Sequence, residues 1–588
     1  MKRRSLLIIG ALAFSSIIGL TSCNNESPII DKVDEIIEDA NLELDYNSEY
    51  VDVSVIQSDE KIYSGKEIKL EVKVKDPLNY AFVYATLNNE KIEDLNKILL
   101  VKGTNVIKIY VKSIFVQEGT TNLRDFTFVK KGDGTYKISG YTPSGLVPTR
   151  LEIPSTYLGK EVNEIAFDYN LITGNVESQY SFSAISQIYI PNTIKSISSE
   201  VFLYGESVEQ FIVDESNPVY GAIEKCLFDK VNMLLISAPR VFEGTFNVPK
   251  GTLGIENYAF YRVLNLTDIK FNDELLMIGS RSFYGCSNIK NFALSNNITT
   301  IGSEAFAYCS KLKSITLSSK LESLERQVFN SCIKLESIEI PGSVKYIKEF
   351  AFASCNSLET VILNEGLKTI EQKAFQYTPI KSLVLPSTLK TIGDNAFGAC
   401  EYLTSVTANE GLEKIGKTCF NLCKKLEEFS IPSTLTSIGE GAFTACISLK
   451  NINVSETNTS YMSKDGVLYS KDGKTLIHYP NLANFKRYEI LSGTTTLGFR
   501  CFNYVSNNPY AQSSALFSVE EIVIPKSVTK MINPFYGANR VSIIYEGTKE
   551  EFASIETSAT IDGETMSWNT GSMISSVTCN DGVLAAWN

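Results

Sequence analysis

The sequence predicts a mainly β solenoid with short helical or 3-10 turns, preceded by a small β-sandwich. Nine phenylalanines recur at a spacing of 23 residues, with one step of 22, and similar residue types surround each of them. A separate upstream segment has the period of two that is typical of strands. A fixed period of this length indicates stacked units that complete one another's core. The nine residues are Phe260, Phe283, Phe306, Phe329, Phe352, Phe375, Phe397, Phe420 and Phe443.

Each repeat places apolar residues at fixed offsets from its phenylalanine. Around Phe329 these residues are Leu321, Leu324, Cys332, Leu335, Ile338 and Ile340. The alternation that ends at Ile340 predicts a short parallel strand, which adds one rung to a sheet. Proline often follows this strand, as Pro341 does here, where its missing N–H ends the pairing.

Residues 1–22 predict a lipoprotein signal peptide. Basic residues at positions 2 to 4 precede an apolar stretch of about 15 residues, which is shorter than the ~20 that a membrane-spanning helix needs. The run Leu20-Thr21-Ser22-Cys23 resembles a bacterial lipobox. That resemblance implies that Cys23 becomes the first mature residue and carries acyl chains into a membrane. The alternative is an ordinary signal peptide in which Cys23 is incidental.

The charge balance argues against a nucleic-acid partner. The chain has 55 Lys and Arg residues against 67 Asp and Glu residues, a net charge of −12. Removal of residues 1–22 takes away three cations and no acids, so the mature chain would carry −15. A phosphate backbone requires clustered cations, which this acidic chain does not offer.

The remaining chain divides by pattern. Alternating residues at 68–74 and 106–111 indicate a small β-sandwich that resembles immunoglobulin-like modules and would act as a spacer. Before it, a helical stripe on a short tether is formed by Ile30, Val33, Ile36, Ile37 and Ala40. The predicted parts are a tether (23–48), the immunoglobulin-like β-sandwich (49–117), an N-terminal solenoid cap (118–166), the solenoid (167–545) with hairpin interruptions at 217–239 and 458–480, and a C-terminal cap and tail (546–588).

Three motifs together resemble one family. They are the repeat I-x-x-x-A-F-x-x-C-x-x-L-x-x-I-x-L-P, the run D-G-V-L-Y at 465–469 and Y-x-G-T-x-x-E-F at 545–552. Over residues 125–580 the chain is similar to the BspA-like leucine-rich repeat family of bacterial surface proteins. The resemblance implies a right-handed leucine-rich repeat solenoid, exposure on the cell surface and a frequent role in adhesion. It implies no particular ligand.

Cysteine recurs three residues after most of the phenylalanines. Thr378 takes this place in the shortened repeat. We expect buried structural thiols, although stacked rungs about 4.8 Å apart also allow disulfides. Zinc needs four convergent ligands, so a ladder of single thiols predicts no metal site. The seven are Cys286, Cys309, Cys332, Cys355, Cys400, Cys423 and Cys446.

The sequence predicts no enzyme and no cofactor. His478 is the single histidine, and hydrolase mechanisms based on serine or cysteine usually need an imidazole beside the nucleophile. A carboxylate pair could still act as in glycosidases, but no spacing singles one out among 67 acids.

The candidate binding face consists of the outward positions of the predicted strands, which are mostly Ser, Thr and Asn. An alternative is that these residue types simply suit exposed strands. A second candidate surface is the stretch 506–514 with nearby Phe502, Tyr504, Tyr510, Phe517, Phe535 and Tyr536. The face residues are Asn291, Ser314, Thr316, Ser337, Glu339, Thr360, Ser382, Ser405, Thr407, Glu428, Ser430, Asn451 and Asn453.

These observations predict a lipid-anchored adhesin on the outer face of a bacterial membrane that recognises an extracellular protein or glycan. The alternatives are a surface protein that captures glycans or peptides for uptake, and a surface-coat component without a ligand. Both alternatives use the same scaffold.

Overall fold

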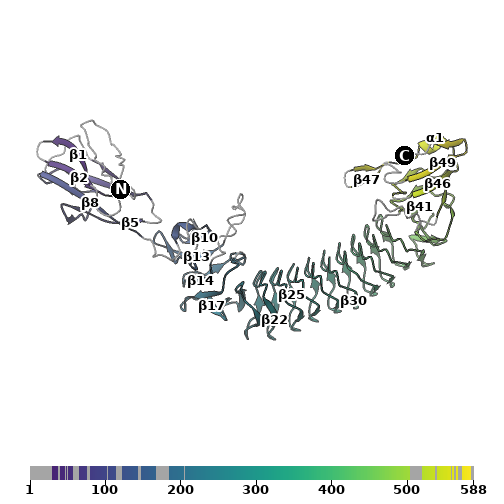
Figure 1. Ribbon diagram of the computed structural model, residues 1–588, viewed down its shortest axis with the longest axis horizontal. Helices are drawn as coiled ribbons and strands as arrows, with labels where there is room; N and C mark the ends of the chain where they lie inside the picture. Colours follow the sequence, from purple (N-terminus) through teal and green to yellow (C-terminus); the bar gives the residue numbers. More distant parts are fainter. Residues whose placement is uncertain are drawn as a thin grey trace. The chain divides into compact units, whose positions relative to one another are not determined.

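The fold is known from a computed structural model, which divides the chain into two compact units, Met1–Ile185 and Ser186–Asn588 (Figure 1). The described residues are 30–37, 40–46, 48, 51–56, 65–75, 80–101, 103–113, 122–142, 148–166, 185–203, 205–503, 519–536, 539–557, 559–561, 564–566 and 573–584. Cys23 and the stretch 506–514 lie outside them.

Two sheets at the start of the first unit share one core. Their strand orders are β1-β2-β8-β5-β6 and β3-β4-β7. The strands are β1 (Ile30–Ile37), β2 (Ala40–Asp45), β3 (Val51–Ile56), β4 (Glu67–Val74), β5 (Tyr80–Leu87), β6 (Glu90–Lys91), β7 (Ile98–Leu99) and β8 (Gly103–Ser113). Leu44, Val53 and Ile107 from the two sheets lie in a single buried cluster. Alternation therefore yields paired sheets with a common apolar layer.

The helical stripe predicted before these sheets is wrong. The segments Ile30–Ile37 and Ala40–Asp45 are strands, and β2 pairs in parallel with β8. Leu42, Leu44 and Tyr46 are all buried, at alternate positions. This period of two places Leu42, Leu44 and Tyr46 in the core, which a helical spacing would not do.

A further sheet in the first unit has the order β12-β13-β10-β9. Its elements and their neighbours are the 3-10 helix η1 (Leu123–Asp125), β9 (Phe126–Lys130), β10 (Tyr136–Tyr141), β11 (Arg150–Glu152), β12 (Thr156–Tyr157) and β13 (Lys160–Ile165). The rings of Phe128 and Tyr157 stack across it with centroids 4.0 Å apart.

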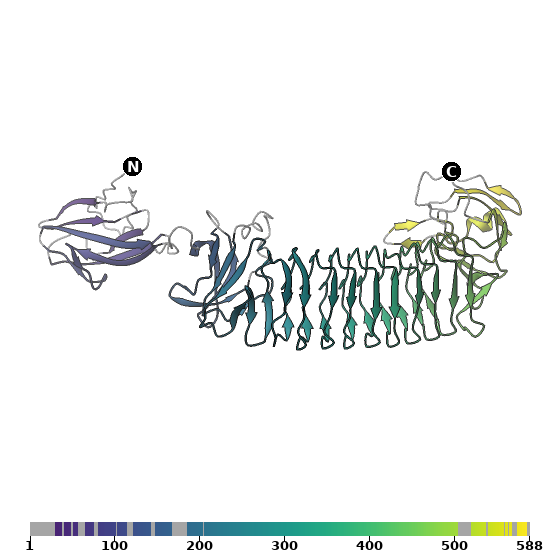
Figure 2. The same ribbon diagram turned by 60° about the horizontal axis from the view of Figure 1, so that its bottom comes forward.

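The second unit is a β-solenoid, part of a fold of about 16 turns with almost no helix. Figure 2 shows its strands in parallel rows. The long-strand ladder contains β14 (Gln187–Ile190), β16 (Gln210–Val213), β20 (Gly244–Asn247), β22 (Leu266–Lys270), β24 (Asn291–Ala293), β26 (Ser314–Thr316), β28 (Ser337–Ile340), β30 (Thr360–Leu363), β32 (Ser382–Val384), β34 (Ser405–Thr407), β36 (Glu428–Ile431), β38 (Asn451–Val454), β42 (Arg487–Glu489), β44 (Glu521–Ile524), β46 (Asn539–Tyr545) and β49 (Met573–Cys579).

A second row, the short-strand ladder, was not predicted. Each of its strands has two residues and ends five residues before the repeat phenylalanine in the regular coils. Its members are β15 (Ser196–Ile197), β21 (Gly254–Ile255), β23 (Met277–Ile278), β25 (Thr300–Ile301), β27 (Ser323–Leu324), β29 (Tyr346–Ile347), β31 (Thr369–Ile370), β33 (Thr391–Ile392), β35 (Lys414–Ile415), β37 (Ser437–Ile438), β43 (Thr496–Leu497) and β45 (Lys530–Met531).

The nine phenylalanines form a continuous buried column, as predicted. Each side chain is at most 1% exposed. Neighbouring rings are nearly parallel with centroids 5.0 to 5.8 Å apart. Each coil therefore supplies one ring to a core that grows along the solenoid axis.

Backbone strain accompanies this column. The residues two before and two after each phenylalanine have positive φ, for example Gln327 (56°) and Ser331 (59°) beside Phe329. Most of them are not glycine, so each costs about 1–2 kcal/mol of local conformational energy. The resulting turn lets Phe329 donate its N–H to the carbonyl of Ala351 in the next coil at 2.8 Å. Repeated in the coils from Phe260 to Phe420, this hydrogen bond offsets part of the strain.

The cysteine ladder is buried. In every case the thiol donates to the carbonyl of the phenylalanine of the preceding coil, as Cys332 does to Phe306 at 3.1 Å. All eleven described cysteines are free thiols. Burial raises the pKa of Cys286 and Cys355 to about 12 and that of Cys400 to about 11. These thiols act as packing groups that each satisfy one carbonyl.

Two antiparallel meanders interrupt the repeats. The first has β17 (Tyr220–Ile223), β18 (Cys226–Asp229) and β19 (Leu234–Ser237), and the second has β39 (Tyr461–Lys464), β40 (Val467–Ser470) and β41 (Thr475–His478). The third strand of each joins the short-strand ladder in parallel, through β21 and β43. Each predicted hairpin thus continues into a strand that restarts the solenoid.

The C-terminal end contains α1 (Lys549–Ala553), β47 (Ala559–Ile561), β48 (Glu564–Met566) and β50 (Gly582–Leu584). Thr548 caps α1, because its hydroxyl accepts the N–H of Glu551 while the Glu551 carboxylate accepts the N–H of Thr548. This reciprocal pair explains why so short a helix forms.

Candidate functional site

The predicted candidate face lies on the outer side of the long-strand ladder. Of its thirteen residues, twelve are exposed and Asn451 is half-buried. Residues of successive coils lie in register, so that Ser314 faces Asn291 and its hydroxyl donates to the Asn291 amide oxygen at 2.8 Å. Ile362 and Val384 lie on the same face with 48% and 61% exposure. The structure thus brings the predicted residues together as a shallow, hydroxyl-rich surface.

A different surface carries the aromatic groups. Tyr258, Tyr261, Tyr284, Tyr308 and Arg281, here called the tyrosine–arginine cluster, belong to three consecutive coils on the phenylalanine side of the solenoid. Tyr261 and Tyr284 stack with centroids 5.0 Å apart and planes 17° apart. Tyr308 continues the row at 5.1 Å with a 48° tilt and is 47% exposed.

Arg281 is held in place at the centre of this cluster. Its Nε and Nη2 donate to the two oxygens of Glu304 at 2.9 and 2.8 Å, and its Nη1 donates to the Tyr258 hydroxyl at 3.3 Å. The hydrogen bonds to Glu304 raise the pKa of Arg281 above the ordinary value of a guanidinium group. Burial raises the pKa of Tyr284, so that its hydroxyl remains a donor. The cluster is therefore a rigid group of rings and donors.

Sequence reasoning missed this cluster. Tyr261 and Tyr284 directly follow a repeat phenylalanine, and Tyr308 stands two residues after one. That signal was available, but it becomes a surface only when the coils are stacked in register. Tyr377 occupies the same offset as Tyr308 in a later coil and is 57% exposed, yet no neighbouring tyrosine extends it into a row.

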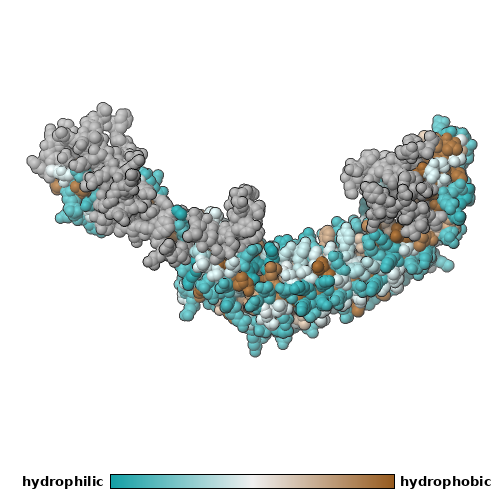
Figure 3. Space-filling model, viewed as in Figure 1, coloured by the Kyte–Doolittle hydropathy of each residue, from teal (hydrophilic) through white to brown (hydrophobic). Residues whose placement is uncertain are grey.

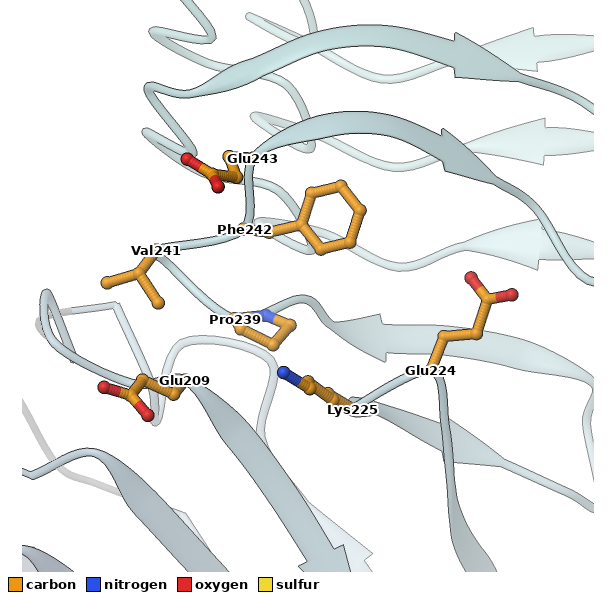
Figure 4. A pocket seen from close by; sticks show the side chains of 7 residues that line it. All are labelled: Glu209, Glu224, Lys225, Pro239, Val241, Phe242 and Glu243. Atoms are coloured by element: carbon orange, nitrogen blue, oxygen red, sulfur yellow. The ribbon is translucent and has the colours of Figure 1, made fainter.

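A pocket of about 530 Å³ lies beside the first meander (Figure 4). Glu224 and Lys225 belong to the turn between β17 and β18, and Phe242 and Pro239 supply an apolar wall. The complete lining is Glu209, Glu224, Lys225, Pro239, Val241, Phe242 and Glu243. Three carboxylates around one ammonium give it a net negative charge, which suits a cation better than an anion.

His478 is unsuited to catalysis. The ring is 3% exposed and lies beside Phe443, with centroids 5.9 Å apart. Burial lowers the pKa of His478 to about 3, so the imidazole is neutral at ordinary pH and closed to substrate. Within the described ranges, no group of three or more His, Cys, Asp or Glu side chains is arranged to hold a metal.

The C-terminal aromatic surface is only partly described. Phe502 and Phe535 are fully buried and stack at 5.4 Å, so they belong to the core rather than to a surface. Tyr536 is half-buried under the Arg500 guanidinium, which lies 4.0 Å from its ring centroid. Tyr504, Tyr510 and Phe517 lie outside the described residues, as does Cys23. Among the residues that are described, no helix has the length and apolarity to cross a membrane.

A model of the BspA type leucine-rich repeat region matches residues 155–242, 253–380 and 368–488, which together exceed half of the chain. The chain belongs to the BspA-type leucine-rich repeat family. The phenylalanine column, the buried cysteines and the meanders fall largely within the matched region. Their occurrence together in one chain therefore agrees with this membership. No curated protein matches the chain.

Solved structures of three bacterial proteins are similar to this chain over part of its length. A leucine rich cell surface protein from Faecalibacterium prausnitzii is 19% identical, with 74% of this chain and 97% of that chain covered and a TM-score of 0.35. A leucine-rich repeat protein from Bacteroides ovatus is 21% identical, with 75% and 97% covered and a TM-score of 0.43. The pneumococcal vaccine antigen PcpA is 22% identical, with 44% and 72% covered and a TM-score of 0.32.

Proposed function

We propose that this protein is a non-catalytic, bacterial cell-surface protein that binds an extracellular protein through the tyrosine–arginine cluster. The observation that carries the proposal is the row Tyr261, Tyr284 and Tyr308 beside a fixed Arg281. Tyrosine and arginine dominate the hot spots of protein interfaces. Because the rings are already ordered by stacking, a partner would lose little side-chain entropy on binding them.

The same geometry favours a protein partner over a glycan. A sugar ring stacks on an open aromatic face, but the faces of Tyr261 and Tyr284 cover one another at a 17° interplanar angle. Ring edges and hydroxyl groups remain for contact, and these suit the mixed polar and apolar surface of a protein. Arg281 already shares both carboxylate oxygens of Glu304, so the contact does not depend on an acidic partner.

The experiment is a binding screen of the full chain against purified extracellular-matrix proteins and a glycan array. We expect a saturable protein hit that Tyr308→Ala weakens at least tenfold, as loss of a hot-spot residue does. The matched control is Tyr377→Ala, which removes an exposed tyrosine at the same repeat offset outside the cluster. Hits confined to glycans would favour capture for uptake, and no hits would favour a coat component. Equal losses from both variants would contradict the assignment to the cluster.

The hydroxyl-rich candidate face remains a second proposed contact surface for the same partner class. Its side chains are short, so each contributes little contact area. Val384 is its most exposed large apolar residue. A Val384→Lys variant therefore tests this face separately, and an unchanged affinity would remove it from the interface.

Two further parts complete the proposed function. Acyl chains on Cys23 would anchor the protein, and the immunoglobulin-like β-sandwich, proposed at 49–117 and joined in the structure by β1 and β2, would act as a spacer. The two sheets with a common core support the spacer. Cys23→Ser should release the protein from the membrane fraction, and retention there would contradict the anchor.

A further inference from the structure

Exposed apolar side chains gather at the start of the short-strand ladder. Val231, Met233, Leu253, Leu276 and Met277, here called the apolar patch, are each between 38% and 65% exposed. They come from three successive coils. The N–H of Leu253 donates to the carbonyl of Met233 at 2.8 Å, and that of Leu276 donates to Leu253 at 2.9 Å. The patch is therefore three adjacent rungs wide.

Met233 and Met277 of the patch lie over glycines of the middle rung. A Cβ on Gly254 would lie 2.7 Å from both Leu234 Cδ2 and Met277 Cγ, so these two side chains close over the glycine. Likewise a Cβ on Gly251 would lie 3.1 Å from the methyl group of Met233. Figure 3 shows hydrophobic residues as limited areas on a mainly hydrophilic solenoid surface. A patch on the order of a few hundred Å² has the size of the largest apolar patch on a typical monomer, which is often functional.

The fold itself does not require apolar residues at these positions. The second meander has the same backbone scheme, since Thr495 donates to Lys474 at 2.8 Å and Thr529 donates to Thr495 at 2.9 Å. There the equivalent residues are all polar. They are Asp472, Lys474, Thr495, Thr529 and Lys530. The rungs that follow the patch also carry polar residues, beginning with Thr299, Thr300 and Glu322.

The charges beside the patch are arranged so that opposite charges would lie near each other if two copies packed face to face. Lys250 belongs to the middle rung and Asp273 to the next, at the same repeat position, and both side chains are exposed. A two-fold axis parallel to the strands through the middle rung would reverse the order of the rungs in a facing copy. Lys250 of each copy would then lie one rung, about 4.8 Å along the ladder, from Asp273 of the other. The same axis would place Leu253 of one copy opposite Leu253 of the other.

We propose that the apolar patch is the docking site for a second copy of this chain, packed face to face about that axis. The patch supplies about half of the ~800 Å² per partner of a standard interface, which predicts a weak dimer in solution. Tethering to a common surface would raise the effective concentration of the two copies and favour the pair. This inference does not depend on the tyrosine–arginine cluster, which lies on the phenylalanine side of the coils.

The test uses the full chain in the bacterial membrane with Leu253→Cys. Because Leu253 faces its own copy across the axis, we expect a disulfide-linked dimer on a non-reducing gel under mild oxidation. Thr495→Cys, at the equivalent rung after the second meander, is the matched control and should remain monomeric. Equal crosslinking of both variants, or none of Leu253→Cys, would overturn the proposal.

A second pair of variants addresses the contact itself. L276K/M277K in the Leu253→Cys background should reduce the crosslinked fraction at least tenfold, whereas Thr529→Lys in that background should not reduce it. Unchanged thermal unfolding would show that the lysines act on association. A different result would overturn the proposal and assign the patch to a lipid surface. In that case the full chain would form no dimer but would bind phosphatidylcholine vesicles, and L276K/M277K would abolish this binding.

Discussion

The two meanders have the same backbone but different interiors. Phe211 donates its N–H to the carbonyl of Lys225 at 2.9 Å, and Ile452 donates equivalently to Gly466 at 2.9 Å. At the first meander a buried apolar cluster begins at Cys226 and continues through the phenylalanine column to Leu468. At the second meander that cluster ends and another begins at Val467, the position equivalent to Cys226. Backbone pairing therefore starts a new apolar cluster at each meander, whereas the side chains decide how polar its interior is.

Three positions differ between the two interiors. Phe228, Ser237 and Ala238 of the first meander correspond to Tyr469, His478 and Tyr479 of the second. The Tyr469 hydroxyl lies 2.7 Å from the Tyr488 hydroxyl in a buried hydrogen bond. The second meander thus has hydroxyl groups in its interior where the first has Phe228 and Ala238.

Loss of a shared asparagine should have the largest effect. The buried Asn458 amide donates to the carbonyls of Pro432 and Leu435 at 2.8 and 2.9 Å and accepts the N–H groups of Ser460 and Tyr461, both at 2.8 Å. Asn458→Ala would leave four backbone groups unsatisfied, at a cost of about 3–5 kcal/mol.

Asn217 makes the equivalent bonds in the first meander, so Asn217→Ala should cost a similar amount. Denaturant unfolding checks both values, and Asn453→Ala, at an exposed position, should change stability by less than about 0.5 kcal/mol. A large difference between the two meanders would break the equivalence drawn from their backbones.

Acid should weaken the second meander selectively. The folded pKa of His478 is lowered by burial to about 3, whereas the unfolded chain takes up this proton near pH 6.5. The unfolded state thus binds more protons between these values, and stability falls as the pH falls. The contribution is about 1.4 kcal/mol per pH unit.

His478→Ser introduces the residue that the first meander carries at this place. The variant should lose this part of the pH dependence of unfolding while the carboxylates contribute as before. An unchanged slope in denaturant titrations between pH 6 and pH 4 would show that the ring is not buried and neutral.

Tyr469→Phe should destabilise the protein by about 1–2 kcal/mol, because the hydroxyl loses its hydrogen bonds with Tyr488 and with the N–H of Leu491 while the ring is retained. The reverse exchange, Phe228→Tyr, should also destabilise it. Tyr488, the hydrogen-bond partner of Tyr469, is the buried residue of β42. The equivalent buried residue of β20 is Phe246, which offers the new hydroxyl no hydrogen-bond partner. Thermal unfolding of the two variants measures both effects. A stabilising Phe228→Tyr would contradict the apolar character assigned to the first interior.

The turn between the first two strands of each meander gives the smallest expected effect. Lys225 has a φ of 69°, and the second meander has Gly466 with a φ of 80° there. Lys225→Gly should stabilise the protein by about 0.5–1 kcal/mol, because glycine adopts this conformation without strain.

Gly466→Lys should destabilise the protein by more than that, since its Cβ would lie 2.9 Å from the Asn451 Cβ. Denaturation midpoints check both exchanges. A loss of stability in Lys225→Gly would mean that the lysine side chain makes a contact worth more than the strain.

The sequence was sufficient for the part of the fold that repeats. The spacing of Phe260 to Phe443 predicts the buried column, and alternation around Ile338 predicts the long strands. The short strands were not predicted, because two residues such as Thr300 and Ile301 are too few to show a period. The positive φ angles on either side of each phenylalanine were not predicted, because these positions are rarely glycine.

Surfaces were harder to predict than the core. The exposure of Ser314 and its neighbours follows directly from alternation, so their location was predictable. The tyrosine–arginine cluster joins residues about 23 positions apart, and its ring contacts depend on how closely adjacent coils stack. Such a row has no signature within any single repeat.

The buried cysteines have a consequence for how the protein matures. In the finished fold each ladder thiol is sealed in the core and engaged with a carbonyl, beyond the reach of oxidants and disulfide exchange. A chain that crosses a membrane unfolded would instead present all of these sulfurs at once to an oxidising compartment. The vulnerable period of such a chain would be the interval before the coils close, when the thiols are not yet sealed in the core.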